Sequence, residues 1–296
     1  DPLYRNYHHD TLTFSMVYAF SESFMLPISH DEVVYGKGSL INKMPGLYDN
    51  KFAGVRGFLA YMLAHPGKKL MFMGSELGQF DEWNSTEQLQ WNLLGYEKHR
   101  QLNHFFATAN KFYCDTPAMH ENDYDWNGFQ WIALDDYKHS IISFRRIAYD
   151  GSEVIVVCNF QPMLRENYKI GVPKFGIYKE VLNSEAEEFG GCGIVNEGEL
   201  KAQDAADHDL PYSINITLAP LSVIYIELDK ELPAPEKPKK EKTTNRKAAA
   251  LKKAKAEKAA KAESKAEGKN DEKPVVEEKE ETKETKAEEK IETVEE

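Results

Sequence analysis

The stretch that decides the fold is DNKFAGVRGFLAYMLAHPGKKLMFMG, residues 49–74, where a helical pattern passes directly into a short apolar run. Apolar residues recur there at spacings of three and four, which predicts one face of a helix. That face holds Phe52, Val55, Leu59 and Met62. Pro66 and Gly67 end the helix, and the apolar residues 69–74 that follow predict a buried strand.

The same alternation continues on both sides of this stretch. Asp10 is placed to cap a helix over residues 11–20, and the apolar run 24–28 predicts a strand. A third helix is predicted over residues 96–113. Helix, strand, helix, strand, helix is the rhythm of a parallel sheet that is covered on both faces, so we expect an α/β arrangement for residues 1–115.

The pattern of the sequence changes after residue 115. Short runs with alternating character, separated by turn signals, predict an antiparallel sandwich of six or seven strands over residues 116–230. The runs are 129–134, 140–146, 153–160, 178–183, 212–219 and 223–228. A sandwich closes its own core, so we expect this part to fold without the residues before it.

Residues 231–296 have a different composition from the rest of the chain. They contain no Phe, Tyr or Trp, and 18 basic residues balance 18 acidic ones, so the net charge of −12 lies on residues 1–230. Such a segment cannot bury enough apolar surface to offset the entropy lost on ordering. It is interpreted as a disordered tail rich in Lys, Glu and Ala.

Composition also excludes several classes of partner. A net charge of −12 argues against nucleic acid or an anionic membrane surface, because both attract basic patches. No uninterrupted apolar stretch is long enough to cross a bilayer. Cys114, Cys158 and Cys192 are odd in number and widely spaced, which disfavours a disulfide framework or a zinc site and suits the cytoplasm.

Candidate functional residues follow the ends of the predicted strands. Ligands of α/β sheets and barrels bind beyond the carboxyl ends of the strands, and His30 and Asp31 follow the strand predicted over 24–28. A carboxylate that accepts hydrogen bonds beside an imidazole that donates one suits a sugar. The alternative is a local loop pair in which Asp31 caps a turn. Glu76, after the second strand, is either functional on the same face or a buried structural acceptor.

Other side chains are candidates for binding a sugar or a metal ion. The tryptophans that could stack on glucose rings are Trp83, Trp91, Trp126 and Trp131. Trp83 follows a loop and is the best candidate, whereas Trp131 lies in an alternating run and is expected in the core. Adjacent histidines such as His8 and His9 rarely bind one metal ion, so no metal site is predicted there. Asp10 is interpreted as a helix cap instead.

Four stretches resemble the bacterial 1,4-α-glucan branching enzymes of the α-amylase superfamily. They are LPISHDEVVYGKGSLINKMPG (26–46), MLAHPGKKLMFMGSELGQFDEW (62–83), LQWNLL (89–94) and MHENDYDWNGFQWI (119–132). A bare His-Asp pair suits any relative in the superfamily, but SHDEVV followed by MPG and GSELGQFDEWN is specific to the branching group. The resemblance covers about residues 1–228, in order.

The resemblance implies a fold and a mechanism. Residues 1–115 would be the last strands and helices of a (β/α)₈ barrel, and residues 116–230 a C-terminal β-sandwich. Family members retain configuration with an Asp nucleophile, a Glu acid/base and a second Asp that stabilises the transition state. Asp31 matches this second Asp, and His30 matches the adjacent His that contacts the sugar. The nucleophile and acid/base motifs are absent from this chain.

The implied activity is cleavage of an α-1,4 bond in a glucan and transfer of the chain to a 6-hydroxyl. We expect α-glucan such as glycogen or amylose as partner, no cofactor, a monomer and a cytoplasmic location. The alternatives are a hydrolase of the same superfamily and a noncatalytic glucan-binding protein. The chain begins with Asp1 rather than Met, and we expect a C-terminal fragment that is inactive alone.

Deleting residues 231–296 from the complete protein should leave its melting temperature and activity nearly unaltered, because this segment has no apolar face to pack. Thermal unfolding of the two proteins side by side measures the effect. A loss of several degrees would show that the segment docks on the body of the protein.

Overall fold

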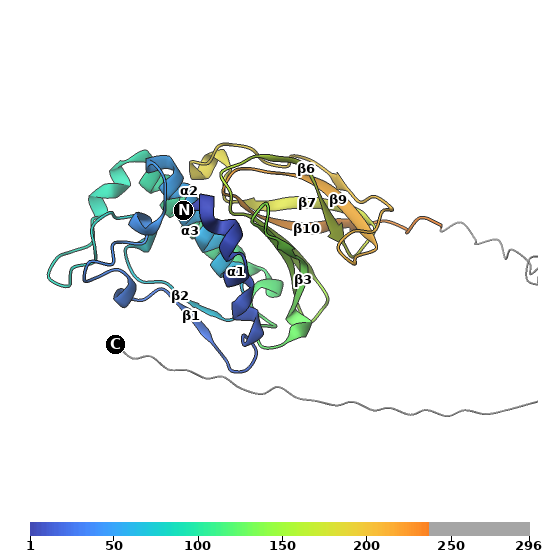
Figure 1. Ribbon diagram of the computed structural model, residues 1–296, viewed down its shortest axis with the longest axis horizontal. Helices are drawn as coiled ribbons and strands as arrows, with labels where there is room; N and C mark the ends of the chain where they lie inside the picture. Colours follow the sequence, from blue (N-terminus) through green and yellow to red (C-terminus); the bar gives the residue numbers. More distant parts are fainter. Residues whose placement is uncertain (237–296) are drawn as a thin grey trace, which may run out of the picture. The chain divides into compact units, whose positions relative to one another are not determined.

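Helices and two short strands pack against one face of an antiparallel sheet in the computed structural model, which describes residues 1–236 (Figure 1). The last strand, β10, runs Val223–Glu231, and the N–H of Leu232 donates to the carbonyl of Phe175 at 2.9 Å. Regular backbone therefore continues past the predicted start of the tail at residue 231. The rest of the predicted tail, 237–296, lies outside the described residues.

Two parallel strands flank a long helix in the first part of the chain. β1 is Met25–Pro27, α2 is Tyr48–Ala64 and β2 is Lys68–Leu70. Met25 lies opposite Lys68 in a parallel register. The predicted alternation of helix and strand is thus present, but β2 ends at Leu70 rather than at residue 74. Two strands do not establish a closed barrel, which stays a prediction.

The first predicted helix is broken into shorter pieces. A 3₁₀ helix spans Pro2–His8, α1 spans only Asp10–Phe14, and another 3₁₀ helix spans Ser15–Val17. The cap assigned to Asp10 is wrong, since this residue is the first of α1 and the N-cap position, His9, makes no side-chain cap bond. The third helix is confirmed, since α3 runs Glu97–Asp115. Its last residue coincides with the predicted domain boundary at residue 115. That boundary itself stays a prediction.

The second part is an antiparallel sandwich, as predicted. Its six-stranded sheet has the order β3-β4-β5-β10-β7-β8, and β6 pairs with β9 in the second sheet. The remaining bounds are β3 Phe129–Asp136, β4 Ile141–Ile147, β5 Glu153–Asn159, β6 Arg165–Val172, β7 Gly176–Asn183, β8 Leu200–Lys201 and β9 Tyr212–Leu218. The runs named from the sequence omit β6 and β8; β6 opens with charged residues, and only its second half is buried.

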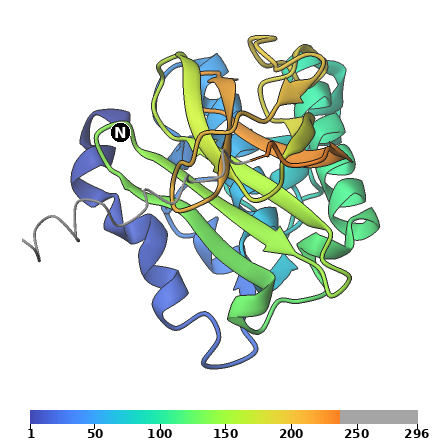
Figure 2. The same ribbon diagram turned by 90° about the vertical axis from the view of Figure 1, so that its right-hand side faces the viewer.

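Both faces of the six-stranded sheet are buried. On β5, Ile155 and Val157 belong to the core between the two sheets, whereas Val156 belongs to a core shared with α2 and α3. Tyr225 of β10 lies in this second core, and its hydroxyl donates to the carbonyl of Ala60 in α2 at 2.6 Å. Figure 2 shows light-blue segments behind the green and yellow strands, with the dark-blue helical segments to their left. Residues 116–230 therefore close only one face of the sheet by themselves.

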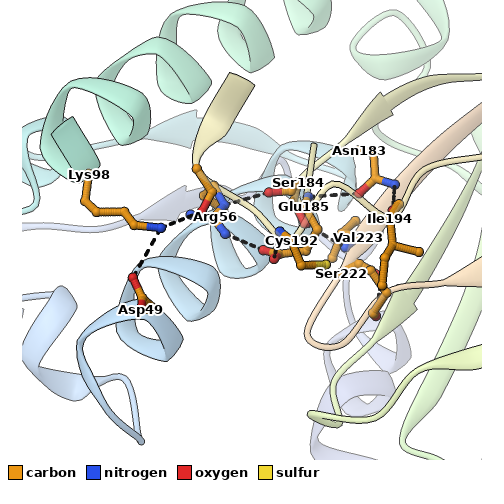
Figure 3. A network of polar contacts seen from close by, with 12 residues as sticks. Asp49, Arg56, Lys98, Asn183, Ser184, Glu185, Cys192, Ile194, Ser222 and Val223 are labelled. Carbon is orange, nitrogen blue, oxygen red and sulfur yellow. Dashed lines mark hydrogen bonds and ion pairs between the residues drawn. The ribbon is translucent and has the colours of Figure 1, made fainter. Parts of the chain in front are cut away.

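A buried ion pair joins the helical layer to the sandwich (Figure 3). The guanidinium of Arg56 on α2 pairs with the carboxylate of Glu185, and its Nε donates to the carbonyl of Ser184 at 2.6 Å. Both charged side chains are at least nine-tenths buried. Nearby, Lys98 of α3 contacts Asp49 of α2 at 3.2 Å. The loop after β7 is thereby fixed to α2.

A second ionic cluster is centred on Asp123. Its fully buried carboxylate accepts from Arg146 Nη2 at 2.5 Å and from Lys68 Nζ at 3.0 Å. Arg146 of β4 also donates to the carbonyl of Ala64 at 2.8 Å. Burial raises the pKa of Asp123, but Arg146, Lys69 and Lys68 outweigh it and hold this pKa below its usual value.

Asp123→Asn should lower the free energy of unfolding by about 3 kcal/mol, because it leaves Arg146 buried without its counter-charge. Asp229→Asn is the control: it removes the carboxylate of a half-exposed pair with Lys179 and should cost less than about 1 kcal/mol. Urea denaturation measures both. Similar losses in the two variants would contradict this account of the cluster.

The difference between wild type and Asp123→Asn should also depend on pH. Because the pKa of Asp123 is lowered in the folded state, its stabilisation is complete above the ordinary Asp value of about 3.9. It is lost as the pH falls through the lower folded pKa. The two denaturation curves should therefore converge at acid pH.

Candidate functional site

His30 and Asp31 lie together beyond the carboxyl end of β1, as predicted. They open a one-turn 3₁₀ helix, His30–Glu32, and His30 Nε2 lies 3.2 Å from Asp31 Oδ1. Their side chains are 54% and 67% exposed, so a ligand can reach both. Asp31 sits inside this turn rather than capping it, since the N-cap position is Ser29. The two side chains form a local pair that is open to solvent.

Two aromatic rings flank the imidazole of His30. The ring of Phe72 lies 6.1 Å from that of His30 and the ring of Trp83 lies 6.2 Å away, measured between centroids. Phe72 and Trp83 contact each other edge to face at 5.1 Å. The loop after β1 and the segment after β2 thus contribute to one surface. Trp83, the predicted stacking candidate, is the tryptophan that this surface contains.

The other tryptophans are placed differently. Trp131 packs against Phe129 and Phe144 of the sheet, which confirms its predicted place at the core. Trp126 contacts Phe20 at 5.0 Å between centroids and is about half exposed, as is Trp91. The contacts described for these three do not include His30 or Asp31.

A small hollow opens beside Trp83. Its lining includes Ser39, Gly74, Ser75, Gln79 and Asp81. The cavity measures about 20 Å³, room for one water-sized group and not for a sugar ring. The Oε1 atom of Gln79 is buried and has no hydrogen-bond partner among the described residues. The site is therefore an open surface with a hydroxyl-sized recess rather than an enclosed pocket.

Glu76 acts locally in this structure. Its Oε2 accepts from the N–H of Gly74 at 2.9 Å, and Gly74 has a φ of +90°, a conformation that glycine adopts readily. The bond stabilises the turn by which the chain leaves β2. Of the two interpretations of Glu76, the geometry supports the structural acceptor.

Phe72 was missed by sequence reasoning. It lies in the apolar run 69–74, which was interpreted as one buried strand. Because β2 ends at Leu70, Phe72 leaves the strand and its ring reaches that of His30. Gly74 is the feature of the sequence that could have indicated this. A glycine at the end of an apolar run often marks a turn, and Gly74 has a positive φ here, so the strand ends before it.

Within residues 1–236, His, Cys, Asp and Glu form no group of three that could hold a metal ion. His9 is engaged elsewhere, since its Nε2 lies 3.0 Å from the carbonyl oxygen of Leu134. None of the helices described there has the length and apolar character needed to cross a membrane.

Comparison with known proteins finds one matching family model and several similar proteins. Residues 131–229 match the model of the alpha-amylase C-terminal all-beta domain, which confirms the all-β part of the predicted fold. Over 228 residues the chain is 50% identical to the 1,4-alpha-glucan branching enzyme of Aquifex aeolicus and equally to that of Halothermothrix orenii. The enzyme of Francisella tularensis subsp. novicida is 50% identical over 232 residues.

These alignments cover 77–78% of this chain and 36% of each relative, so the chain spans just over a third of their length. A crystal structure of AmyP in complex with maltose superposes with a TM-score of 0.43 at 12% identity, over 62% of this chain and 36% of that one. That likeness is too low to add to the argument.

Proposed function

Because the chain is a relative of the bacterial 1,4-alpha-glucan branching enzymes, we propose that it is the C-terminal part of such an enzyme. The complete protein would cleave an α-1,4 bond of a linear glucan and transfer the freed chain to a 6-hydroxyl. The observation that carries this proposal is the 50% identity over 228 residues to named branching enzymes. The cytoplasmic location, the monomeric state and the lack of a cofactor stay predictions.

We assign Asp31 the role of stabilising the transition state and His30 that of contacting the sugar. Their position beyond the end of β1 and their exposure support this assignment. In a retaining double displacement, the ring passes through an oxocarbenium-like state, and hydrogen bonds to its hydroxyls strengthen there. Asp31 would accept such bonds from neighbouring hydroxyls, favouring the distorted ring over the ground state. The nucleophile and the acid/base would come from outside this chain.

For the fold, we propose that β1 and β2 are the last two strands of a (β/α)₈ barrel within residues 1–115. Their parallel pairing and the helix that connects them support this arrangement. So do the apolar side chains left exposed on or beside the strands: Met25, Leu70 and Met73 are each about half exposed. Further parallel strands would cover them.

Asp31→Asn in the complete enzyme should lower kcat by on the order of 10²-fold or more, with little change in melting temperature. Glu32→Gln is a matched control: this neighbouring carboxylate is exposed and faces Lys37 at 3.7 Å, so its loss should leave kcat nearly unchanged. Initial rates on amylose, followed by iodine spectra, measure both. An unchanged kcat in Asp31→Asn would remove this residue from the site.

Residues 1–296 expressed alone should show no branching activity, because the two carboxylates of the double displacement are not in this chain. Purified chain incubated with amylose should leave the iodine spectrum unaltered, whereas the complete enzyme should shift it without producing reducing ends. Release of reducing ends by the complete enzyme would favour the hydrolase alternative. A spectral shift by the isolated chain would mean that it contains a second catalytic constellation.

A further inference from the structure

A carboxylate joins the two loops that form the candidate site. Glu82 Oε1 accepts from the N–H of Gly38 at 2.6 Å, and Oε2 accepts from the N–H of Gly36 at 3.1 Å. The glycines lie on the loop that follows His30 and Asp31, and Glu82 lies beside Trp83. Each carboxylate oxygen therefore holds one backbone N–H of the opposite loop.

The conformation of the glycine loop makes this arrangement possible. Gly36 and Gly38 have φ values of +81° and +77°. Tyr35, directly before Gly36, has a φ of +58°. Backbone N–H groups in a turn can point toward a common centre, where an anion is favoured. A Cβ added at Gly36 would meet nothing within 4 Å, so this position requires glycine for its backbone angle rather than for space.

Further hydrogen bonds tie the same two loops together. The N–H of Trp83 donates to the carbonyl of Val33 at 3.0 Å, and Asn42 Nδ2 donates to the carbonyl of Phe80 at 2.5 Å. Val33 follows directly after the 3₁₀ helix that carries His30 and Asp31. A shift of one loop against the other would therefore change the distance between the His30 imidazole and the Trp83 ring.

We infer that Glu82 is a positioning residue of the candidate site, which holds His30 and Asp31 in register with Trp83 by binding the N–H groups of Gly36 and Gly38. The inference rests on the proposed function, because it assumes that this surface receives the glucan. Glu82 lies in the loop that carries Trp83, and we assign it no contact with the substrate.

A carboxylate suits this position better than any neutral side chain. The hydrogen bonds from Gly38 and Gly36 lower the pKa of Glu82, which stays ionised at neutral pH. Both of its oxygens then act as acceptors. A glutamine offers one acceptor and would direct its NH₂ group at the second backbone N–H. Glu82→Gln therefore breaks half of the contact while changing size very little.

In the complete enzyme, Glu82→Gln should lower kcat on amylose by on the order of tenfold, since small misplacements of reacting groups have such effects. KM should stay within about twofold if the ground state is bound as before. A second variant, Gly36→Ala, strains the partner loop and should lower kcat in the same way. In the double variant the losses should be less than additive, because both act through one contact.

Glu180→Gln is the matched control. Glu180 of β7 also accepts a backbone N–H, from Asn196 at 3.3 Å, together with the side-chain amide of the same residue at 2.7 Å. It lies in the sandwich, so this variant should lower the melting temperature without lowering kcat at 25 °C. Hydrogen exchange of residues 33–40 should accelerate in Glu82→Gln and not in Glu180→Gln.

The outcomes separate the inference from the proposed function. A complete wild-type enzyme that leaves amylose unbranched would overturn the proposed function. A branching wild type with an unchanged kcat in Glu82→Gln, or an equal loss in Glu180→Gln, would overturn the role of Glu82. Failure of Glu82→Gln to fold, with Gly36→Ala folded and fully active, would overturn it as well.

Discussion

The structure depends on one constraint: the six-stranded sheet is apolar on both faces, so both must be covered. Residues 154–158 are apolar at every position rather than at alternate ones, and along β5 they point in turn to the second sheet and to the helices. Burial of apolar surface is the main favourable contribution to folding, and it acts here on two sides of one sheet. The helical part is consequently not an appendage of the sandwich, because it supplies half of the cover that the sheet needs.

This constraint also reaches the candidate site, through α2. The helix is held against the sandwich by the Arg56–Glu185 pair and by the contact between Tyr225 and Ala60. Near its other end, Lys51 Nζ donates to the carbonyl of Met44 at 3.0 Å and so fixes the loop that follows the site. Contacts of α2 thus reach both the sheet and the segment that follows the site. Each of them involves either a buried charge or a backbone group, for which a lost partner is costly.

The sequence predicted what periodicity and strand ends control, namely α2, α3, the sandwich and the location of His30 and Asp31. It did not predict contacts that depend on charge in unexpected places. Arg56 lies beside the apolar face of α2, four residues after Phe52, and it is buried with the carboxylate of Glu185, far along the chain, as its counter-charge. Phe72 and Glu82 belong to the site through turns at glycines, and turns of this kind shift side chains between faces without leaving a periodic signal.

The strand that delivers the site is short, and this decides where its rigidity must come from. β1 has three residues and pairs with three residues of β2, a ladder too small to hold a loop in place by itself. His30 and Asp31, directly beyond it, are more than half exposed and gain little from packing. Regions with few buried contacts open readily unless other bonds hold them. The order of this surface therefore depends on the loops around it, which are held by buried side chains such as those of Val33 and Ile41 and by hydrogen bonds between the loops, among them the two that the Glu82 carboxylate accepts.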